Sequence, residues 1–182
     1  MEVWDLCNKD RQPLHRTITR GEPLPPGTYH QVVHVCVFHP DGRLLIQQRQ
    51  PFKSGWSNLW DITVSGSAVA GETSRQAAER EVREEIGLAL DLSGVRPTLT
   101  VNFAQGFDDF YLVRRAPDLA ALRLQPEEVQ SVRWADLPEI LSLRKAGTFI
   151  PYQPDFLSLL FALNQKADLL TAPDVSVPTP PI

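Results

Sequence analysis

A glycine-flanked acidic segment, residues 66–88 (GSAVAGETSRQAAEREVREEIGL), constrains the fold more than any other part of this chain. Thr73 is followed three positions later by Gln76, a spacing typical of the capping box that begins a helix. Gly87 can adopt the left-handed conformation that ends one. The segment therefore predicts a glycine-bearing loop followed by a helix over residues 74–86.

Three glutamates gather on one side of this predicted helix. At about 100° per residue, Glu81, Glu84 and Glu85 share an arc of about 100° that borders the apolar stripe. The stripe consists of Ala78, Val82 and Ile86. Like charges three or four positions apart destabilise a helix. A hard divalent cation such as Mg²⁺ reverses this effect, because it prefers oxygen ligands.

An alternative interpretation is a solvated, charged helix face. Glu79 with Arg83, and Arg80 with Glu84, are pairs of opposite charge four positions apart, which stabilise an exposed helix. These pairs leave Glu81 and Glu85 facing each other without a partner on the helix. They also give no reason for the glycine and the glutamate that stand upstream.

The spacing of the segment carries a resemblance. Gly66 is followed after five residues by Glu72 and, after seven more, by the run REVREEIGL at residues 80–88. This arrangement resembles the complete signature of the Nudix hydrolases. The resemblance implies an α/β fold, an α/β/α sandwich with a mixed sheet and a loop-helix-loop catalytic motif. It also implies an enzyme that uses Mg²⁺, or Mn²⁺ in its place, to hydrolyse a diphosphate linked to another group, most often in a nucleoside diphosphate derivative.

The resemblance also implies roles for individual residues. The implied metal ligands are the carboxylates of Glu81, Glu84 and Glu85 and the carbonyl of Gly66. Arg80 and Glu72 would form an ion pair that fixes the loop against the helix. A metal ion lowers the pKa of a bound water and neutralises the diphosphate, so that hydroxide attacks phosphorus. A carboxylate would position or deprotonate that water.

Similarity beyond the signature resembles the branch of the family that contains isopentenyl-diphosphate isomerase. It rests on the motifs EVWDL, RGEPLPPGTYH, DGRLLIQQR and K-x-x-W-x-x-x-WD. The isomerases need a cysteine before the signature glycine and a metal-binding histidine after it, where this chain has Ser65 and Ser67. His30 matches one further metal histidine, whereas Pro23 replaces another. Since serine is a far weaker acid than cysteine, hydrolysis is favoured. Isomerase-like activity and a non-catalytic nucleotide-sensing module remain alternatives.

Several charged residues outside the segment are candidates for the same site. Arg49, Lys53 and Arg20 lie where they could bind a diphosphate, although surface exposure is equally common for such residues. An additional carboxylate could act as the base. The candidates for this base are Glu128 and Asp109, with their neighbours Glu127 and Asp108.

Two pairs of ring-bearing residues allow more than one interpretation. His30 and His34 share one face of a predicted strand, which can indicate a metal pair, but their apolar neighbours favour structural histidines. Trp56 and Trp60 could stack on a base, yet aromatic residues at this spacing more often close the edge of a core.

Composition sets the remaining bounds. The chain has 182 residues, with 18 Lys and Arg against 22 Asp and Glu and a net charge of −4, which argues against binding to nucleic acid or to an anionic membrane. Cys7 and Cys36 predict free thiols. The chain shows neither a secretory signal nor an apolar run of about 18 residues. We therefore expect a cytoplasmic protein with a small-molecule diphosphate substrate; the sequence leaves the oligomeric state open, a homodimer included.

The order of elements predicts one domain and a tail. Residues 1–167 form the predicted Nudix hydrolase domain, and residues 168–182 form a Pro-rich, flexible C-terminal tail. Strands are expected at 3–6, 31–38, 44–47, 60–64, 95–103, 107–113 and 129–134. Further helices are expected at 136–143 and 155–167. Because strands occur both in hairpins and around helices, the sheet should be mixed, with helices packed outside it.

Overall fold

Two β-sheets and three α-helices make up the computed structural model, which describes residues 2–165. The predicted tail, residues 168–182, and the last two positions of the predicted helix 155–167 lie outside the described residues. No helix in the described part of the chain is long and apolar enough to cross a membrane.

The smaller sheet is an N-terminal hairpin of two antiparallel strands, β1 (Val3–Cys7) and β2 (Pro13–Thr19). β2 is absent from the sequence-based prediction. Only Ile18 is buried in this strand, so the sequence lacks the alternation of apolar and polar residues that indicates a strand. A backbone bridge between Cys7 and Tyr29 joins the hairpin to the rest of the molecule.

The larger sheet contains seven strands and is mixed, as predicted. Its strands are β3 (His30–Phe38), β4 (Leu44–Arg49), β5 (Trp60–Asp61), β6 (Val64–Ser67), β7 (Leu99–Phe103), β8 (Gly106–Arg114) and β9 (Val129–Ala135). The order is β5-β4-β3-β8-β7, with β6 paired to β3 and β9 paired to β4. The strands β3 and β8 are parallel, and the other pairs are antiparallel. Because β3 and β4 pair only at Phe38 and Leu44, the sheet divides beyond this point.

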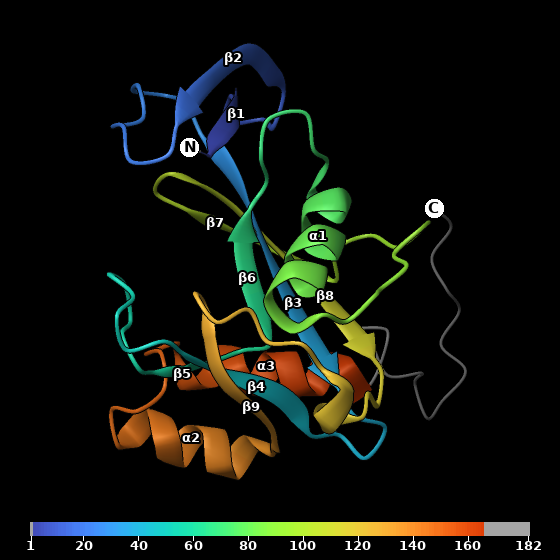
Figure 1. Ribbon diagram of the computed structural model, residues 1–182. Coiled ribbons are helices and arrows are strands. Elements are labelled where there is room, and N and C mark those ends of the chain that lie inside the picture. Colours follow the sequence, from blue (N-terminus) through green and yellow to red (C-terminus); the bar gives the residue numbers. More distant parts are fainter. Residues whose placement is uncertain (1, 166–182) are drawn as a thin grey trace, which may run out of the picture.

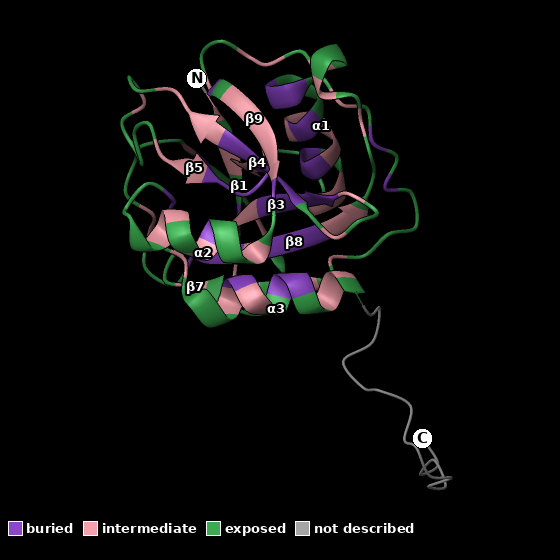
Figure 2. Cartoon of the chain, turned by 90° about the horizontal axis from the view of Figure 1, so that it is seen from below, coloured by how far each residue is buried: buried purple, intermediate pink, exposed green. Residues whose placement is uncertain are grey.

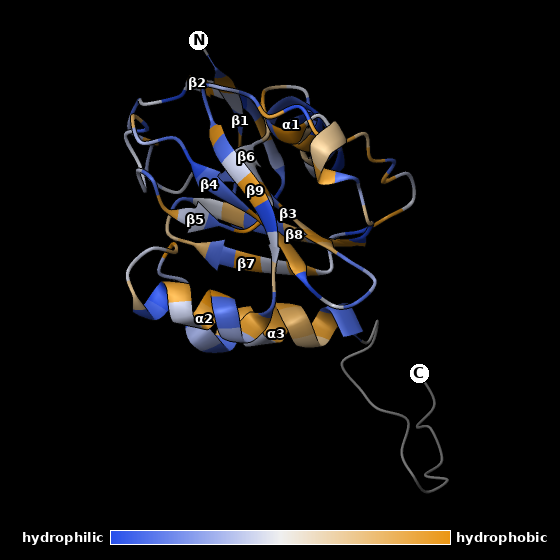
Figure 3. Ribbon diagram, turned by 60° about the horizontal axis from the view of Figure 1, so that its bottom comes forward, coloured by the Kyte–Doolittle hydropathy of each residue, from blue (hydrophilic) through white to orange (hydrophobic). Residues whose placement is uncertain are grey.

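Helices cover both faces of the larger sheet (Figures 1 and 2). α1 (Ser74–Ile86) lies on one face, and α2 (Leu137–Lys145) and α3 (Pro154–Gln165) lie on the other. Alternate residues of β3 serve the two faces: Val33, Val35 and Val37 pack towards α1, while Cys36 and Phe38 pack towards α3. Figure 3 shows hydrophobic residues along α3 where it meets the sheet. The predicted α/β/α sandwich is therefore confirmed.

One predicted strand, residues 60–64, is divided into β5 and β6. The chain leaves the edge of β4 at β5 and joins the edge of β3 at β6. The buried Thr63 lies at the crossing, where its hydroxyl accepts from Val37 N at 2.9 Å and donates to Leu45 O at 2.5 Å. Thr63 thus satisfies backbone groups of both strands at the point where they part.

The strand predicted at residues 95–103 is shorter in the structure. β7 begins at Leu99, because Pro97 has no backbone N–H to donate to a neighbouring strand. A single 3₁₀ turn, Leu119–Ala121, lies in the connection between β8 and β9.

Substitution of Gly106 by alanine is expected to destabilise the fold by about 1–3 kcal/mol, as overpacking does elsewhere. A Cβ at this position would overlap the backbone carbonyl of His30 in the adjacent strand, which cannot move without disturbing β3. Thermal unfolding should show a melting temperature about 2–4 °C lower for each kcal/mol lost. Gly55→Ala is the matched control, because a Cβ there meets nothing within 4 Å. Equal melting temperatures for the two variants would contradict this account.

Candidate active site

The acidic helix begins and ends where the sequence predicts. The Thr73 hydroxyl accepts from Gln76 N at 3.3 Å, and the Gln76 side chain accepts from Thr73 N at 2.9 Å, which completes a capping box. Gly87 ends the helix in the left-handed conformation, with φ of 69°. Both signals are local, so the loop-helix-loop segment follows directly from its own residues.

A polar pocket opens beside α1, where the larger sheet divides. Its walls come from α1, β3, β6, the last residue of β4 and the loop after it, the residues that flank the N-terminal hairpin, and the segment before β9. The predicted site residues that line it are Arg20, Arg49, Lys53, Gly66, Arg80, Glu81, Glu84, Glu85 and Glu128. Predicted site residues that are far apart in the sequence therefore line the same pocket.

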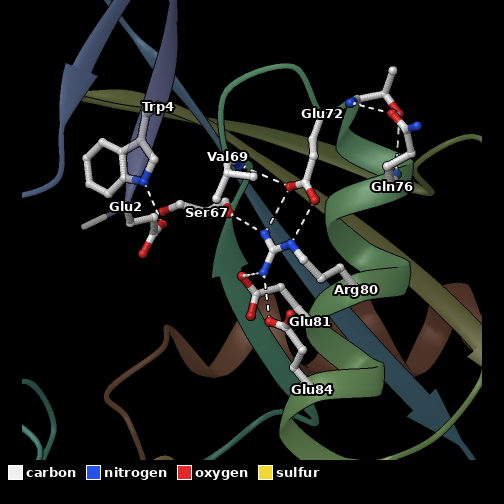
Figure 4. A network of polar contacts seen from close by, with 10 residues as sticks. Glu2, Trp4, Ser67, Val69, Glu72, Gln76, Arg80, Glu81 and Glu84 are labelled. Atoms are coloured by element: carbon white, nitrogen blue, oxygen red, sulfur yellow. Dashed lines mark hydrogen bonds and ion pairs between the residues drawn. The ribbon is translucent and has the colours of Figure 1, made fainter.

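Arg80 is the centre of a polar network in this pocket (Figure 4). Its guanidinium donates to both carboxylate oxygens of Glu72, at 2.7 and 2.9 Å, and to the carbonyl of Ser67 at 3.0 Å. It also donates to Glu81 at 2.9 Å and to Glu84 at 3.1 Å. The Glu72 carboxylate in turn accepts from Val69 N at 3.0 Å. The arginine therefore holds the glycine-bearing loop, the end of β6 and the helix in one arrangement.

Gly66 allows the close approach of Glu81 to β6. A Cβ on this residue would overlap the Glu81 carboxyl group. Gly66 pairs with Val33 of β3 and leaves the space into which the Glu81 side chain extends. The glycine is thus required by the side chain opposite it, since any other residue would displace that side chain.

Burial raises the pKa of two carboxyl groups of α1. It raises the pKa of Glu85 to about 8 and that of Glu81 to about 7, because water no longer solvates the charged forms. Gln47 of β4 donates to Glu85 at 2.9 Å, which partly offsets the effect on Glu85. Gln47 is absent from the sequence-based candidates, although a glutamine within an apolar strand is a signal of a buried polar contact.

The donor set suits a divalent cation. Glu81, Glu84 and Glu85 offer carboxylate oxygens from one helix, and a hard cation such as Mg²⁺ takes oxygen ligands. In the geometry of residues 2–165, no three His, Cys, Asp or Glu side chains form a ready-made cluster around one point. Arg80 lies between two of these carboxylates. A cation would therefore have to compete with the Arg80 guanidinium for Glu81 and Glu84.

The other cations of the pocket come from separate parts of the chain. Arg20 forms an ion pair with Glu2 at 2.6 Å, so the N-terminal hairpin contributes to the wall. Lys53 forms an ion pair with Glu128 at 2.5 Å. Arg49 donates through Nε to the carbonyl of Gly55 at 3.1 Å, and it has no carboxylate partner among the described residues.

Asp109 does not reach this pocket. It is buried under the N-terminal hairpin, where it accepts from Arg11 at 2.7 Å and from Thr100 at 2.6 Å. We therefore do not retain Asp109 as a candidate base. Of the neighbouring candidates, Asp108 contacts His34 at 3.1 Å and Glu127 is exposed. Glu128 is the candidate base that lines the pocket.

The two histidines and the two tryptophans considered in the sequence occupy different environments. His30 stacks on Trp4, and His34 stacks on Phe110, with centroids 4.2 and 4.3 Å apart, so both histidines pack among aromatic side chains. Trp60 is partly buried and packs against the edge of the core that lies between the larger sheet and the helices α2 and α3, as predicted. Trp56 is exposed, so the prediction that it closes a core edge is wrong.

The fold and the pocket together define a class of protein, an α/β/α sandwich whose loop-helix-loop segment carries an acidic polar site. The family is shown by comparison, since the model of the NUDIX domain matches residues 28–157. The chain belongs to the Nudix hydrolase family, whose members hydrolyse diphosphate linkages.

Individual relatives agree with this assignment. A Listeria innocua protein named as an uncharacterized Nudix hydrolase is 50% identical over 169 residues, which cover 93% of this chain and 99% of the relative. An isopentenyl-diphosphate Δ-isomerase of Streptomyces coelicolor is 31% identical over 164 residues, covering 85% and 82% of the two chains. A crystal structure of a Deinococcus radiodurans protein superposes with a TM-score of 0.69 at 24% identity, covering 87% of this chain and 97% of the other. This last likeness supports the fold alone.

Proposed function

We propose that this protein is a Mg²⁺-dependent hydrolase that cleaves the diphosphate linkage of a small, nucleoside-diphosphate-linked compound by attack of water on phosphorus. The observation that carries the proposal is the meeting of three α1 glutamates with cations from other elements in one pocket. Carboxylates suit a divalent cation, and arginine and lysine suit phosphate oxygens. Mn²⁺ would substitute for Mg²⁺.

Each group of residues has a part in the proposed reaction. Glu81, Glu84, Glu85 and the Gly66 carbonyl would hold the metal, which supplies an acidified water and neutralises phosphate charge. Arg80 and Glu72 are positioning residues, because they hold the loop against the helix.

The cations and the base act on the substrate and on the attacking water. Arg49, Lys53 and Arg20 would bind the phosphate oxygens. The Glu128 carboxylate would accept the proton of the attacking water. It is held at the pocket wall by Lys53, so substrate phosphate that binds Lys53 would free Glu128 for this role.

Isomerisation receives less support from the same pocket. Ser65 and Ser67 line it at the positions that flank Gly66, and neither cysteine of the described chain does. Cys36 is buried in the core between the sheet and α3. Proton transfer to a carbon atom would therefore lack the thiol that the isomerases use. We further propose that the protein acts in the cytoplasm on a small molecule, without nucleic acid or membrane.

A screen of diphosphate compounds tests the proposal, with detection of inorganic phosphate before and after a phosphatase has acted on the phosphomonoester products. At least one compound in Mg²⁺ should yield a nucleoside monophosphate together with the phosphomonoester of the attached group, or inorganic phosphate where the diphosphate is terminal, and EDTA should abolish this turnover. The panel should contain nucleotide sugars, dinucleotides and isopentenyl diphosphate. Conversion of isopentenyl diphosphate to dimethylallyl diphosphate without release of phosphate would favour the isomerase instead. Tight nucleotide binding with no product from any compound would favour the non-catalytic module.

A further inference from the structure

Two exposed aromatic side chains have no role in the proposed chemistry, although they flank the pocket-lining Lys53 in the sequence. They belong to the β4–β5 loop, residues 50–59 (QPFKSGWSNL), in which Phe52 is 68% exposed and Trp56 is 54% exposed. In the part of the chain that the structure describes, neither ring takes part in an aromatic pair or in a cation–π contact. Exposed apolar surface beside a polar site is typical of a binding surface.

The loop is held in one conformation by its own polar contacts. Arg49 donates to the Gly55 carbonyl at 3.1 Å, and the Gln48 amide donates to the Asn58 side chain at 3.1 Å. The Ser57 hydroxyl also donates to the Pro51 carbonyl. Trp56 adopts a φ of 53°, in the left-handed region that a bulky residue seldom occupies. The surrounding contacts therefore maintain a strained tryptophan in place, a feature that occurs at ligand clamps.

The same loop forms part of the pocket wall. Lys53, between the two aromatic residues in the sequence, reaches Glu128 inside the pocket, and Gln50 N donates to the Glu128 carbonyl at 3.0 Å. Figure 1 shows the loop extending to the left of β6, on the side to which the connection between β2 and β3 also extends. A diphosphate held by Arg49 and Lys53 would therefore leave the group attached to it beside the loop.

The lining of the pocket restricts what this group can be. Among residues 2–165, Val32 is the only apolar side chain that lines it, so these residues enclose no apolar space for a hydrocarbon chain. A planar base differs, because it stacks on an aromatic face while its polar edge stays in water. The exposed rings of Trp56 and Phe52 offer such faces, and polar residues lie next to them in the loop.

We propose that the β4–β5 loop is a subsite for a planar base of the substrate, with Trp56 and Phe52 as the stacking residues. This inference rests on the proposed function, since it names the group carried by the diphosphate. Trp56 and Phe52 determine specificity in this account, and they leave the chemistry at phosphorus to the α1 residues.

Two measurements test the subsite. The first is the ratio of kcat/KM for ADP-ribose to that for isopentenyl diphosphate, each in Mg²⁺. The ratio should fall about tenfold in Trp56→Ala and in Phe52→Ala, as expected for one lost base-stacking contact. Trp56→Phe should recover most of the loss because it keeps an aromatic face. The second is calorimetric binding of ADP, which needs no turnover, and Trp56→Ala should weaken it by a similar factor.

Leu159→Ala is the matched control, because this residue is an exposed apolar side chain on α3 that does not line the pocket. It should change neither measurement.

Equal losses of kcat/KM on both compounds in Trp56→Ala would overturn the subsite, since the loop would then act through the shape of the pocket. Hydrolysis of isopentenyl diphosphate alone would also overturn it and would leave the hydrolase intact. If no diphosphate is cleaved, the proposed function fails, and the ADP binding of Trp56→Ala still decides the subsite.

Discussion

Glu85→Gln should lower kcat by roughly a thousandfold, the scale on which removal of one electrostatic stabiliser acts in an active site. Glu85 is almost completely buried and lines the pocket beside Glu81. Glutamine keeps the shape of the side chain and can still pair with Gln47, but it removes the charge that a divalent cation needs. Because burial disfavours the charged form of Glu85, the neutral amide should leave the fold intact.

The measurement is the rate of product formation in Mg²⁺ from the compound that the screen identifies, together with thermal unfolding in EDTA. Glu79→Gln is the matched control, since Glu79 lies on the same helix but accepts from Leu92 N, outside the pocket. It should retain full activity. Glu81→Gln should behave like Glu85→Gln. A fully active Glu85→Gln would remove the main support for the assigned roles of the α1 glutamates.

Gly66→Ala should abolish most of the activity while it changes stability little. A new methyl group would overlap the end of the Glu81 side chain, which is flexible and can turn away. The loss should reach at least about a hundredfold, because a misplacement of about 1 Å can cost that much in catalysis. Gly106→Ala should have the opposite effect, a loss of stability, since its methyl group meets backbone that cannot turn away.

The two glycine variants should therefore be compared in the same experiments. Gly66→Ala is expected to be folded and inactive, with a melting temperature within a few degrees of the parent, and Gly106→Ala is expected to unfold earlier. An active Gly66→Ala would show that the position of Glu81 is unimportant. A large loss of stability in this variant would show that the Glu81 side chain cannot turn away from β6.

Local signals made the helix and its glutamates predictable. The capping residues, the apolar stripe and the acidic arc all lie within residues 66–88, so their interpretation needs no knowledge of the rest of the chain. The cations Arg20, Arg49 and Lys53 were candidates because of their positions next to predicted strands and loops, with ordinary surface exposure as the alternative. All three line the pocket in the structure.

Features that depend on distant contacts were not predictable in the same way. The division of the strand at residues 60–64 depends on Thr63, which bonds to two strands that the sequence does not show to diverge. The place of Asp109 depends on Arg11, which is 98 positions away and lies in a hairpin whose second strand has almost no hydrophobic pattern. Only the folded chain shows that this carboxylate already has a partner.

The N-terminal hairpin has a practical consequence for work on this enzyme. Glu2 and Arg20 line the pocket, although the match to the family domain begins only at residue 28. A fragment trimmed to the matched region would lose this wall and both charges. For the same reason, activity should be measured on a chain that keeps residues 2–27.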